Sequence, residues 1–343
     1  MIDLRSDTVT GPTAEMRAAM GRAEVGDDSY GEDPTVRRLE ERAAELLGKE
    51  AALLVHSGTF ANQLAIKVWT RPGQEVVVDA MSHILLVEPA ATAILSGVAL
   101  VALAPLYQAP ALGALLAGND AYSTNLKALV CVENTHNQAG GRVYAADELR
   151  RLQQVCRSHR LPLHVDGARL FNAAVALGVA PAALAGCTDS VMFCLSKGLA
   201  CPVGSMLCGD RPFIDQAREM RQILGGGLRQ SGILAAAGLV ALESMVERLA
   251  EDHRHARILA DGLAELPGLK LDPALVETNI VIFEVLDRPA SDLVKALARR
   301  EVLCWAVGPT KIRMVTHYEV SEEDMRRAIG AARDSLSPVP STP

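Results

Sequence analysis

Aromatic residues are scarce in this 343-residue sequence, at 3%, so its core must be built mainly from aliphatic side chains. None of the seven cysteines forms a C-x-x-C pair, which argues against a structural zinc site and favours reduced, buried thiols in a cytoplasmic protein. The dinucleotide-binding pattern G-x-G-x-x-G is also missing. We therefore expect no metal in the functional site, and a nicotinamide-dependent dehydrogenase is disfavoured.

Long apolar runs and an excess of positive charge are absent as well. The longest uncharged apolar stretches, near 95–106 and 233–242, fall short of the ~20 residues that a membrane-spanning helix needs. The first residues, M-I-D-L-R-S-D, contain no apolar run and do not predict a signal peptide. The net charge of -7 argues against a nucleic-acid partner. We expect a cytoplasmic protein that binds small molecules, with no membrane or nucleic-acid partner.

Helical and strand patterns alternate along the chain, which predicts an α/β unit with a largely parallel sheet and helices on both faces. Strands are expected at 51–55, 75–78, 129–132, 163–165 and 190–195, and helices at 35–47, 60–69 and 147–159. A helical stretch at 232–260 is expected to lead to a smaller C-terminal part with strands near 278–285 and 311–317 and a helix near 290–300. In open α/β sheets, ligands bind at the carboxyl ends of the strands.

Two opposite charges follow predicted strands. Lys197 lies in F-C-L-S-K-G (Phe193 to Gly198), and Asp166 lies in H-V-D-G-A-R (His164 to Arg169). Pyridoxal phosphate needs such a pair, because a lysine amine bonds to its aldehyde carbon and a carboxylate faces its ring nitrogen. Taken alone, Lys197 could be a solvated surface lysine and Asp166 a helix N-cap.

The run Ser57-Gly58-Thr59 lies between a predicted strand and a predicted helix. Backbone amides at the start of a helix, together with hydroxyl groups, form a phosphate site, and Ser196 could add another hydroxyl. The same three residues could equally form an ordinary turn and cap. This segment is therefore a candidate phosphate site whose signal is weak by itself.

One histidine and two arginines complete the candidate site. His83 follows a strand end, where an imidazole could stack on a flat ring and move protons near neutral pH. Arg169 and Arg313 could clamp a carboxylate through paired hydrogen bonds. A hydrogen-bonded loop histidine and two structural salt bridges are the alternative interpretations.

Together these runs resemble the low-specificity L-threonine aldolases, a family of fold type I pyridoxal-phosphate enzymes. The resemblance extends from about Ile2 to about Val320. It is carried by D-L-R-S-D-T-V-T (Asp3 to Thr10), V-G-D-D-S-Y-G-E-D-P-T-V (Val25 to Val36), E-N-T-H-N (Glu133 to Asn137), H-V-D-G-A-R-L-F-N-A (His164 to Ala173), C-L-S-K-G-L (Cys194 to Leu199), P-V-G-S (Pro202 to Ser205), G-G-G-L-R-Q-S-G (Gly225 to Gly232) and R-M-V-T-H (Arg313 to His317).

The resemblance implies an α/β fold like that of the type I pyridoxal-phosphate-dependent transferases. A large domain at 1–245, with the N-terminal segment and a mainly parallel seven-stranded sheet, would precede a small C-terminal α/β domain at 246–334 and a flexible tail at 335–343. The implied reaction is the reversible cleavage of L-threonine, L-allo-threonine and other β-hydroxy-α-amino acids to glycine and an aldehyde. The implied assembly is a homotetramer, a dimer of dimers with shared active sites.

The family also implies a role for each candidate residue. Lys197 would carry the cofactor, Asp166 would bind its ring nitrogen, and His83 would stack on the ring and lie near the β-hydroxyl group of the substrate. From that position we expect His83 to act as the catalytic base, directly or through water. The phosphate would be held by Ser57, Gly58, Thr59 and Ser196, and by Arg229 of a neighbouring subunit. The substrate carboxylate would be held by Ser6, Arg169 and Arg313, with Arg169 also belonging to the cofactor site.

Two positions depart from the family pattern. Many members carry a histidine where this chain has Ser123, beside Tyr122, and many carry a lysine where it has Gln222. An aminotransferase, a racemase or a β-eliminating lyase on the same scaffold remains an alternative, because all of them use the same lysine and aspartate. A binding protein that keeps the scaffold without catalysis is a further alternative.

Overall fold

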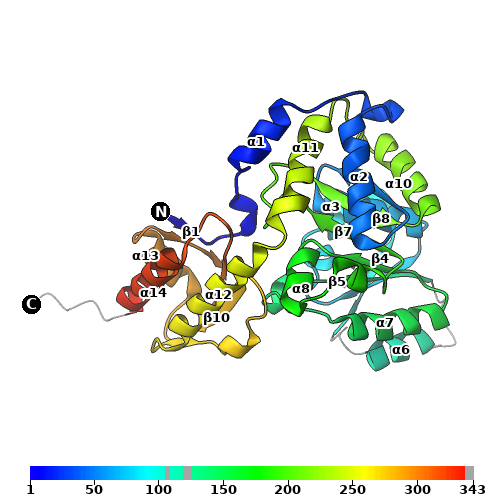
Figure 1. Cartoon of the computed structure of the whole chain (residues 1–343). Helices are drawn as coiled ribbons and strands as arrows, with labels where there is room; N and C mark the ends of the chain where they lie inside the picture. Colours follow the sequence, from blue (N-terminus) through cyan, green and yellow to red (C-terminus); the bar gives the residue numbers. More distant parts are fainter. Residues whose placement is uncertain (105–108, 119–125, 337–343) are drawn as a thin grey trace, which may run out of the picture.

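A computed structural model of the chain describes residues 1–104, 109–118 and 126–336 (Figure 1). Its largest element is a seven-stranded sheet with the strand order β2-β8-β7-β6-β5-β3-β4. The strands are β2 (Ala51–Val55), β3 (Glu75–Asp79), β4 (Ala99–Leu103), β5 (Lys127–Glu133), β6 (Leu163–Asp166), β7 (Ser190–Cys194) and β8 (Ser205–Gly209).

Only β8 runs against the other strands of this sheet. It pairs antiparallel with β2 on one side and with β7 on the other, whereas the pairings from β7 to β4 are all parallel. The predicted mainly parallel, seven-stranded sheet is thereby confirmed. The carboxyl ends of six strands consequently lie along the same edge of the sheet.

Both faces of the sheet are buried, because successive side chains of a strand point to opposite faces. In β2, Ala52 and Leu54 belong to one apolar cluster and Leu53 and Val55 to another. The first cluster includes residues of α2 (Pro34–Leu47), α6 (Ala109–Ala117), α7 (Ala146–Ser158), α8 (Leu170–Leu177), α9 (Pro181–Ala185) and α11 (Gly232–Val240). The second includes residues of α3 (Gly58–Trp69) and α10 (Arg211–Ile223).

Helix α2 shows how local sequence sets the limits of an element. Asp33 is its N-cap and accepts hydrogen bonds from the backbone N–H groups of Thr35 and Val36, while Pro34 occupies the first turn. The helix ends at Gly48, whose φ of 61° is a left-handed conformation that glycine adopts without strain. The helix predicted at 35–47 is therefore fixed at both ends by the chemistry of its flanking residues.

A second sheet lies in the C-terminal part of the chain (yellow to red in Figure 1). Its four strands follow the order β12-β13-β10-β9, and they are β9 (Leu269–Lys270), β10 (Ile280–Val285), β12 (Trp305–Ala306) and β13 (Lys311–Val315). Three helices accompany it, namely α12 (Leu249–Ala264), α13 (Ala290–Ala298) and α14 (Glu322–Leu336). The stretch at 232–260, expected to form one long helix or two, forms two, α11 and α12, with a π-helical turn, η4 (Ala241–Met245), between them.

The start of the chain packs against this C-terminal sheet. Strand β1 (Ile2–Asp3) pairs in parallel with β11 (Val302–Leu303), and the side chains of Ile2 and Leu4 belong to the C-terminal apolar cluster. The predicted large domain included this segment, and the limits at 245 and 334 stay a prediction. Ser335 belongs to α14, so the helix continues past the predicted start of the tail, of which 337–343 lies outside the described residues.

The remaining helical elements connect these layers: α1 (Ala14–Gly21), α4 (His83–Leu86), α5 (Pro89–Ser96) and the short 3-10 helices η1 (Asp7–Val9), η2 (Asp28–Tyr30), η3 (Asn137–Ala139) and η5 (Pro273–Leu275). Among the helices of the described residues, none combines the length and the apolar character that crossing a membrane requires.

Candidate active site

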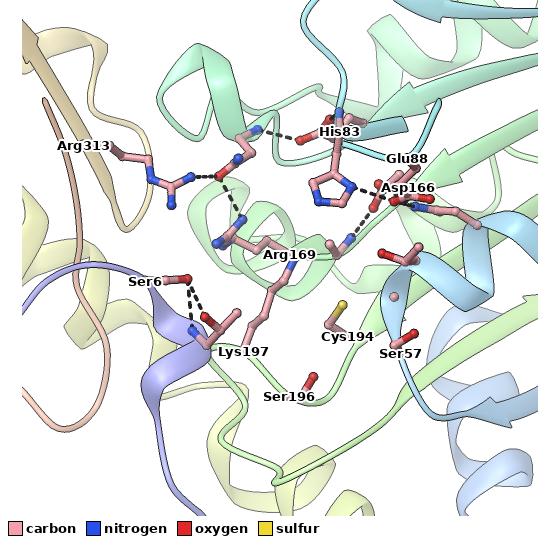
Figure 2. A pocket seen from close by; sticks show the side chains of 17 residues that line it. Ser6, Ser57, His83, Glu88, Asp166, Arg169, Cys194, Ser196, Lys197 and Arg313 are labelled. Carbon is pink, nitrogen blue, oxygen red and sulfur yellow. Dashed lines mark hydrogen bonds and ion pairs between the residues drawn. The ribbon is translucent and has the colours of Figure 1, made fainter. Parts of the chain in front are cut away.

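A cavity of about 240 Å³ lies at the carboxyl edge of the parallel strands (Figure 2). The residues that line it are Ser6, Thr8, Ser57, Gly58, Thr59, Asn62, His83, Glu88, Glu133, Asn137, Asp166, Ala168, Arg169, Cys194, Ser196, Lys197 and Arg313. All the residues predicted for the site from the sequence are therefore brought together, with the exception of Arg229. They come from the ends of several strands and from both termini of the chain.

Lys197 and Asp166 follow neighbouring strands. Asp166 is the last residue of β6, and Lys197 follows the end of β7, its neighbour in the sheet. Lys197 is half-buried, and its carbonyl group accepts a hydrogen bond from Thr10 Oγ1 at 3.0 Å. The lysine backbone is thus anchored to the N-terminal segment, while the side chain enters the cavity (Figure 2).

Asp166 is buried, and its carboxylate has two donors. Oδ2 accepts from Asn62 Nδ2 at 2.9 Å, and Oδ1 accepts from the backbone N–H of Ala168 at 3.1 Å. The alternative that Asp166 caps the next helix is wrong, because Arg169 is the N-cap residue of α8. A buried carboxylate with these two neutral donors can accept a further hydrogen bond from a protonated ring nitrogen.

The candidate phosphate site lies at the start of α3. Ser57 is the N-cap of this 12-residue helix, and its side chain accepts from the backbone N–H of Phe60 at 3.2 Å. The first turn of the helix, which contains Gly58 and Thr59, therefore presents its backbone amides at the cavity. Ser57 and Ser196 lie on the same side of the cavity in Figure 2, with Arg313 opposite.

Gly58 leaves room that no other residue would leave. A Cβ atom at this position would lie 2.7 Å from Cys194 Sγ and 3.1 Å from Met192 Cε, both on β7. The start of α3 can therefore pack this closely against β7 only because the residue is glycine. The donor set fits the three polar parts of pyridoxal phosphate: hydroxyls and amides for the phosphate, an amine for the aldehyde and a carboxylate for the ring nitrogen.

His83 begins α4 and projects into the cavity (Figure 2). Its Nδ1 lies 2.6 Å from Glu88 Oε1, and its backbone N–H donates to Glu133 Oε2 at 2.7 Å. The hydrogen bond to Glu88 raises the pKa of His83 above its ordinary value. Burial and the neighbouring Asp166 raise the pKa of the Glu133 carboxyl.

Arg169 is engaged by a partner that sequence reasoning missed. Its Nε and Nη2 each donate to the carboxylate of Asp7 at 2.7 Å, and both side chains are buried. Burial opposes ionisation of Asp7, but the guanidinium of Arg169 holds the pKa of this carboxyl at about 2. The salt-bridge alternative is thus correct for Arg169, whose Nη1 takes no part in the ion pair with Asp7.

Arg313 is the less satisfied of the two arginines. Its Nη1 donates to Asn137 Oδ1 at 2.9 Å and its Nη2 to the carbonyl of Arg5 at 3.4 Å, while its buried Nε has no hydrogen-bond partner among the described residues. Burial and the charge of Arg169 lower the pKa of Arg313. Because Arg169 Nη1 also donates to Asn137 Oδ1, at 3.4 Å, one amide oxygen lies between two guanidinium groups. Because both groups are positively charged, a negatively charged carboxylate ligand would bind here more strongly than the neutral amide of Asn137 does.

Arg229 is the predicted residue that does not line the cavity. Its side chain is 60% exposed, is hydrogen-bonded to Ser29 and lies 3.9 Å from the Asp27 carboxylate. The role predicted for it was in a neighbouring subunit, and that role stays a prediction. Of the two departures from the family pattern, Gln222 lies exposed on α10, and Ser123, with Tyr122, lies outside the described residues.

Ser6 reaches the cavity from the N-terminal segment, where its hydroxyl caps η1 and accepts from Thr8 at 3.2 Å. The polar residues of the site that the sequence did not single out include Asp7, Thr8, Asn62, Glu88 and Asn137. Asp7 stood in a matched family run, but its pairing with a residue 162 positions away left no local signal. Asn62 lies inside α3 and Glu88 at the start of α5, and a polar residue in a helical segment gives no local signal of a site.

The side chains of His83, Glu88 and Asp166 offer ligand atoms that all lie within 4.8 Å of one another. The same atoms already take part in hydrogen bonds, His83 Nδ1 with Glu88 and Asp166 Oδ2 with Asn62. That the site uses no metal stays a prediction.

Comparison with known proteins defines the class of this protein, which is a lyase. The β-eliminating lyase family matches residues 3–286. The low-specificity L-threonine aldolase of Escherichia coli (strain K12) is 42% identical over 95% of this chain and 96% of its own length. This chain therefore belongs to the low-specificity L-threonine aldolase family, as its sequence runs predicted.

Two solved structures share the fold at low sequence identity. The threonine aldolase of Leishmania major superposes with a TM-score of 0.83 at 20% identity, covering 98% of this chain and all 100% of that one. Serine palmitoyltransferase (SPT), in a structure that contains pyridoxal phosphate, superposes with a TM-score of 0.77 at 18% identity, covering 97% of this chain and 87% of that one. The predicted type I pyridoxal-phosphate fold is confirmed by these likenesses.

Proposed function

We propose that this protein is a pyridoxal-phosphate-dependent carbon–carbon lyase. It cleaves L-threonine, L-allo-threonine and other β-hydroxy-α-amino acids reversibly to glycine and an aldehyde. The observation that carries the proposal is that Lys197 and Asp166 line one cavity, with a helix start on one side and Arg313 on the other. The 42% identity with the Escherichia coli enzyme, over nearly the whole of both chains, supports the same reaction.

The residues of the cavity would hold the cofactor at three points. The amides at the start of α3, with the hydroxyls of Ser57, Thr59 and Ser196, would bind the phosphate. Asp166 would accept the ring N–H, and Lys197 would bond to the aldehyde carbon. When bound, pyridoxal phosphate supplies an electron sink for the pair of electrons released as the Cα–Cβ bond of the substrate breaks.

The substrate carboxylate would bind to Arg313, close to Asn137 Oδ1. That oxygen accepts hydrogen bonds from the guanidinium groups of both Arg169 and Arg313. A planar guanidinium fixes a carboxylate by two parallel hydrogen bonds, so it also fixes the rotation of the amino acid about its N–Cα bond. Only a bond perpendicular to the cofactor plane can pass its electrons into the ring. The carboxylate site therefore selects cleavage of Cα–Cβ over other reactions, with Ser6 and Arg169 Nη1 as further donors.

His83 would take the proton of the β-hydroxyl group as the carbon–carbon bond breaks. A base works best when its pKa lies near the working pH. The hydrogen bond to Glu88 raises the pKa of His83 above its ordinary value, which makes the imidazole a stronger base. The hydroxyl oxygen then becomes the carbonyl oxygen of the departing aldehyde, and the remaining carbon is protonated to give glycine.

We also propose a homotetramer, a dimer of dimers in which Arg229 of one subunit contacts the phosphate bound to the next. The exposure of Arg229 and its anchoring between η2 and the start of α11 support a contact outside its own chain. A cytoplasmic location is supported by seven cysteines that are all buried and free, as expected in a reducing compartment.

The test is to incubate the purified protein with pyridoxal phosphate and L-threonine and to measure glycine and acetaldehyde. Equal amounts of both are expected. In parallel, borohydride reduction followed by peptide mapping should place the cofactor on Lys197. A label on another lysine, or none, would overturn the proposed site. Formation of ammonia and a keto acid, without glycine, would indicate a β-eliminating lyase instead.

A further inference from the structure

Glu88 is a buried carboxylate at the cavity for which neither the family resemblance nor the sequence predicted a role. It precedes α5, and its side chain is 1% exposed. Its Oε1 lies 2.6 Å from Nδ1 of His83, on α4, in the closest polar contact that the His83 ring makes. A carboxylate placed so deeply requires partners, because burying an unpaired charge is costly.

Two neighbouring amides of α3 hold Glu88 in place. Asn62 Nδ2 lies 3.2 Å from Oε1, and Gln63 Nε2 lies 2.8 Å from Oε2. Asn62 Nδ2 also donates to Asp166 at 2.9 Å, so a single amide group joins the carboxylate behind the histidine to the carboxylate predicted for the ring nitrogen. The orientation of the His83 ring is therefore coupled to the cofactor end of the cavity through α3.

The contact decides which nitrogen of His83 carries the hydrogen. An ionised carboxylate only accepts hydrogen bonds, so Nδ1 must be the donor. A neutral imidazole with hydrogen on Nδ1 has its lone pair on Nε2, the nitrogen on the far side of the ring from Glu88. The charged groups that face His83 are Glu88, Asp166 and Lys197, while Glu133 accepts from its backbone N–H.

We propose that Glu88 is a positioning residue that holds His83 with its hydrogen on Nδ1, so that Nε2 receives the proton of the β-hydroxyl group. This inference rests on the proposed lyase function and adds the residue that orients its base. Glu88 does not touch the substrate. Its effect reaches the reaction only through His83.

The first measurement needs no change at Glu88. ¹⁵N-histidine spectra of the full-length chain, with and without cofactor, report the tautomer of each ring, and the His83→Phe spectrum identifies the His83 signal by its loss. We expect neutral His83 to carry its hydrogen on Nδ1. Hydrogen on Nε2 in the neutral ring would overturn the proposal, whatever the protein's activity.

The second measurement compares Glu88→Gln with the unchanged protein. The variant removes the negative charge and keeps the shape, so the His83 signal should titrate at lower pH. The acidic limb of the kcat profile for threonine cleavage should move the same way. We expect kcat to fall about 10- to 100-fold, because general acid–base catalysis contributes about 10²–10⁴ and only part of it is lost. KM and cofactor binding should stay within about twofold in this comparison.

Two controls separate this role from a structural one. Glu40→Gln alters another carboxylate of the large sheet region, which accepts from Leu54 N–H and pairs with Arg218 away from the cavity, and it should leave the His83 signal and kcat unchanged.

In the His83→Phe background, Glu88→Gln should lower kcat no further. A full additional loss there would show that Glu88 acts independently of His83 and would overturn the proposal. If the unchanged protein does not cleave threonine, the proposed function fails, and the tautomer measurement still decides the role of Glu88.

Discussion

Arg169 and Asp7 form a buried two-point ion pair across 162 residues of sequence, with both N···O distances at 2.7 Å. Arg169 stands at the start of α8, just after strand β6 of the large sheet, and Asp7 lies in the N-terminal segment whose strand β1 pairs with β11 of the C-terminal part. The pair therefore fastens the N-terminal segment to the wall of the active site. It also leaves Arg313 as the guanidinium better able to bind an anion.

We expect Asp7→Asn to destabilise the protein by about 3–5 kcal/mol, because it leaves the buried charge of Arg169 without its partner. Urea unfolding at neutral pH measures this loss. The exposed pair of Asp292 and Lys295 provides the control, since Asp292→Asn should cost at most about 1 kcal/mol. Equal losses for the two variants would mean that the buried pair contributes no more than a surface one.

Arg313→Ala should raise KM for threonine and for glycine alike. The loss of a hydrogen-bonded charge pair is worth about 1.5–3 kcal/mol, which corresponds to roughly a 10- to 150-fold change. Steady-state kinetics in the cleavage and synthesis directions supply the values. Lys311→Ala, an exposed position on the same strand, should change neither KM. An unchanged KM in Arg313→Ala would remove this residue from the carboxylate site.

His83→Phe should lose most of the turnover, by about 10²–10⁴-fold, and should still bind the cofactor, because phenylalanine keeps a flat ring but cannot take a proton. The measurements are kcat for threonine and the visible absorption of the loaded protein. His159→Phe, at the C-terminal end of α7, is the matched control and should retain normal turnover. Near-normal kcat in His83→Phe would assign the proton transfer to another group.

Asp252 on α12 should make stability fall as pH rises. Burial raises the pKa of this carboxyl from 3.8 to about 7, despite the nearby Arg248. Between these two values the folded protein binds a proton that the unfolded chain has lost, so the free energy of unfolding decreases with pH, by up to about 4 kcal/mol in total. The stability of Asp252→Asn relative to the unchanged protein should therefore rise from pH 4 to pH 8.

Urea unfolding of both proteins across that range measures the difference. Asp261→Asn, an exposed position on the same helix, should show no such trend. Parallel stability curves for Asp252→Asn and the unchanged protein would contradict the assignment.

The sequence predicted five strands of the large sheet, because β2, β3, β5, β6 and β7 are apolar runs followed by polar residues. It did not predict β4 or β8. Strand β4 reads A-L-V-A-L and β8 reads S-M-L-C-G, and such short apolar runs fit a helix and a strand equally well. The direction of β8 depends on the path of the chain after Lys197, which no local pattern encodes.

The site could be predicted where chemistry coincides with a strand end, as at Lys197 and Asp166. The partners of these groups could not. Asn62 reaches Asp166 from 104 positions away, and Glu88 reaches Asn62 from 26. Such contacts depend on how α3 packs on the sheet, which the residue types alone leave open. For Arg169, the sequence could not decide between two roles, because a guanidinium can either bind a ligand carboxylate or form a structural salt bridge.

The N-terminal segment is joined to the C-terminal part of the chain close to the candidate active site. Ile2 is paired with Val302, and Ser6, only four positions later, already borders the cavity that Arg313 enters from the other side. The carbonyl group of Leu4 accepts a hydrogen bond from the backbone N–H of Val315, so the segment that carries Ser6 is joined directly to the strand that carries Arg313. Removing the first few residues would therefore do more than shorten the chain. It would remove the backbone link between the two sides of the substrate site.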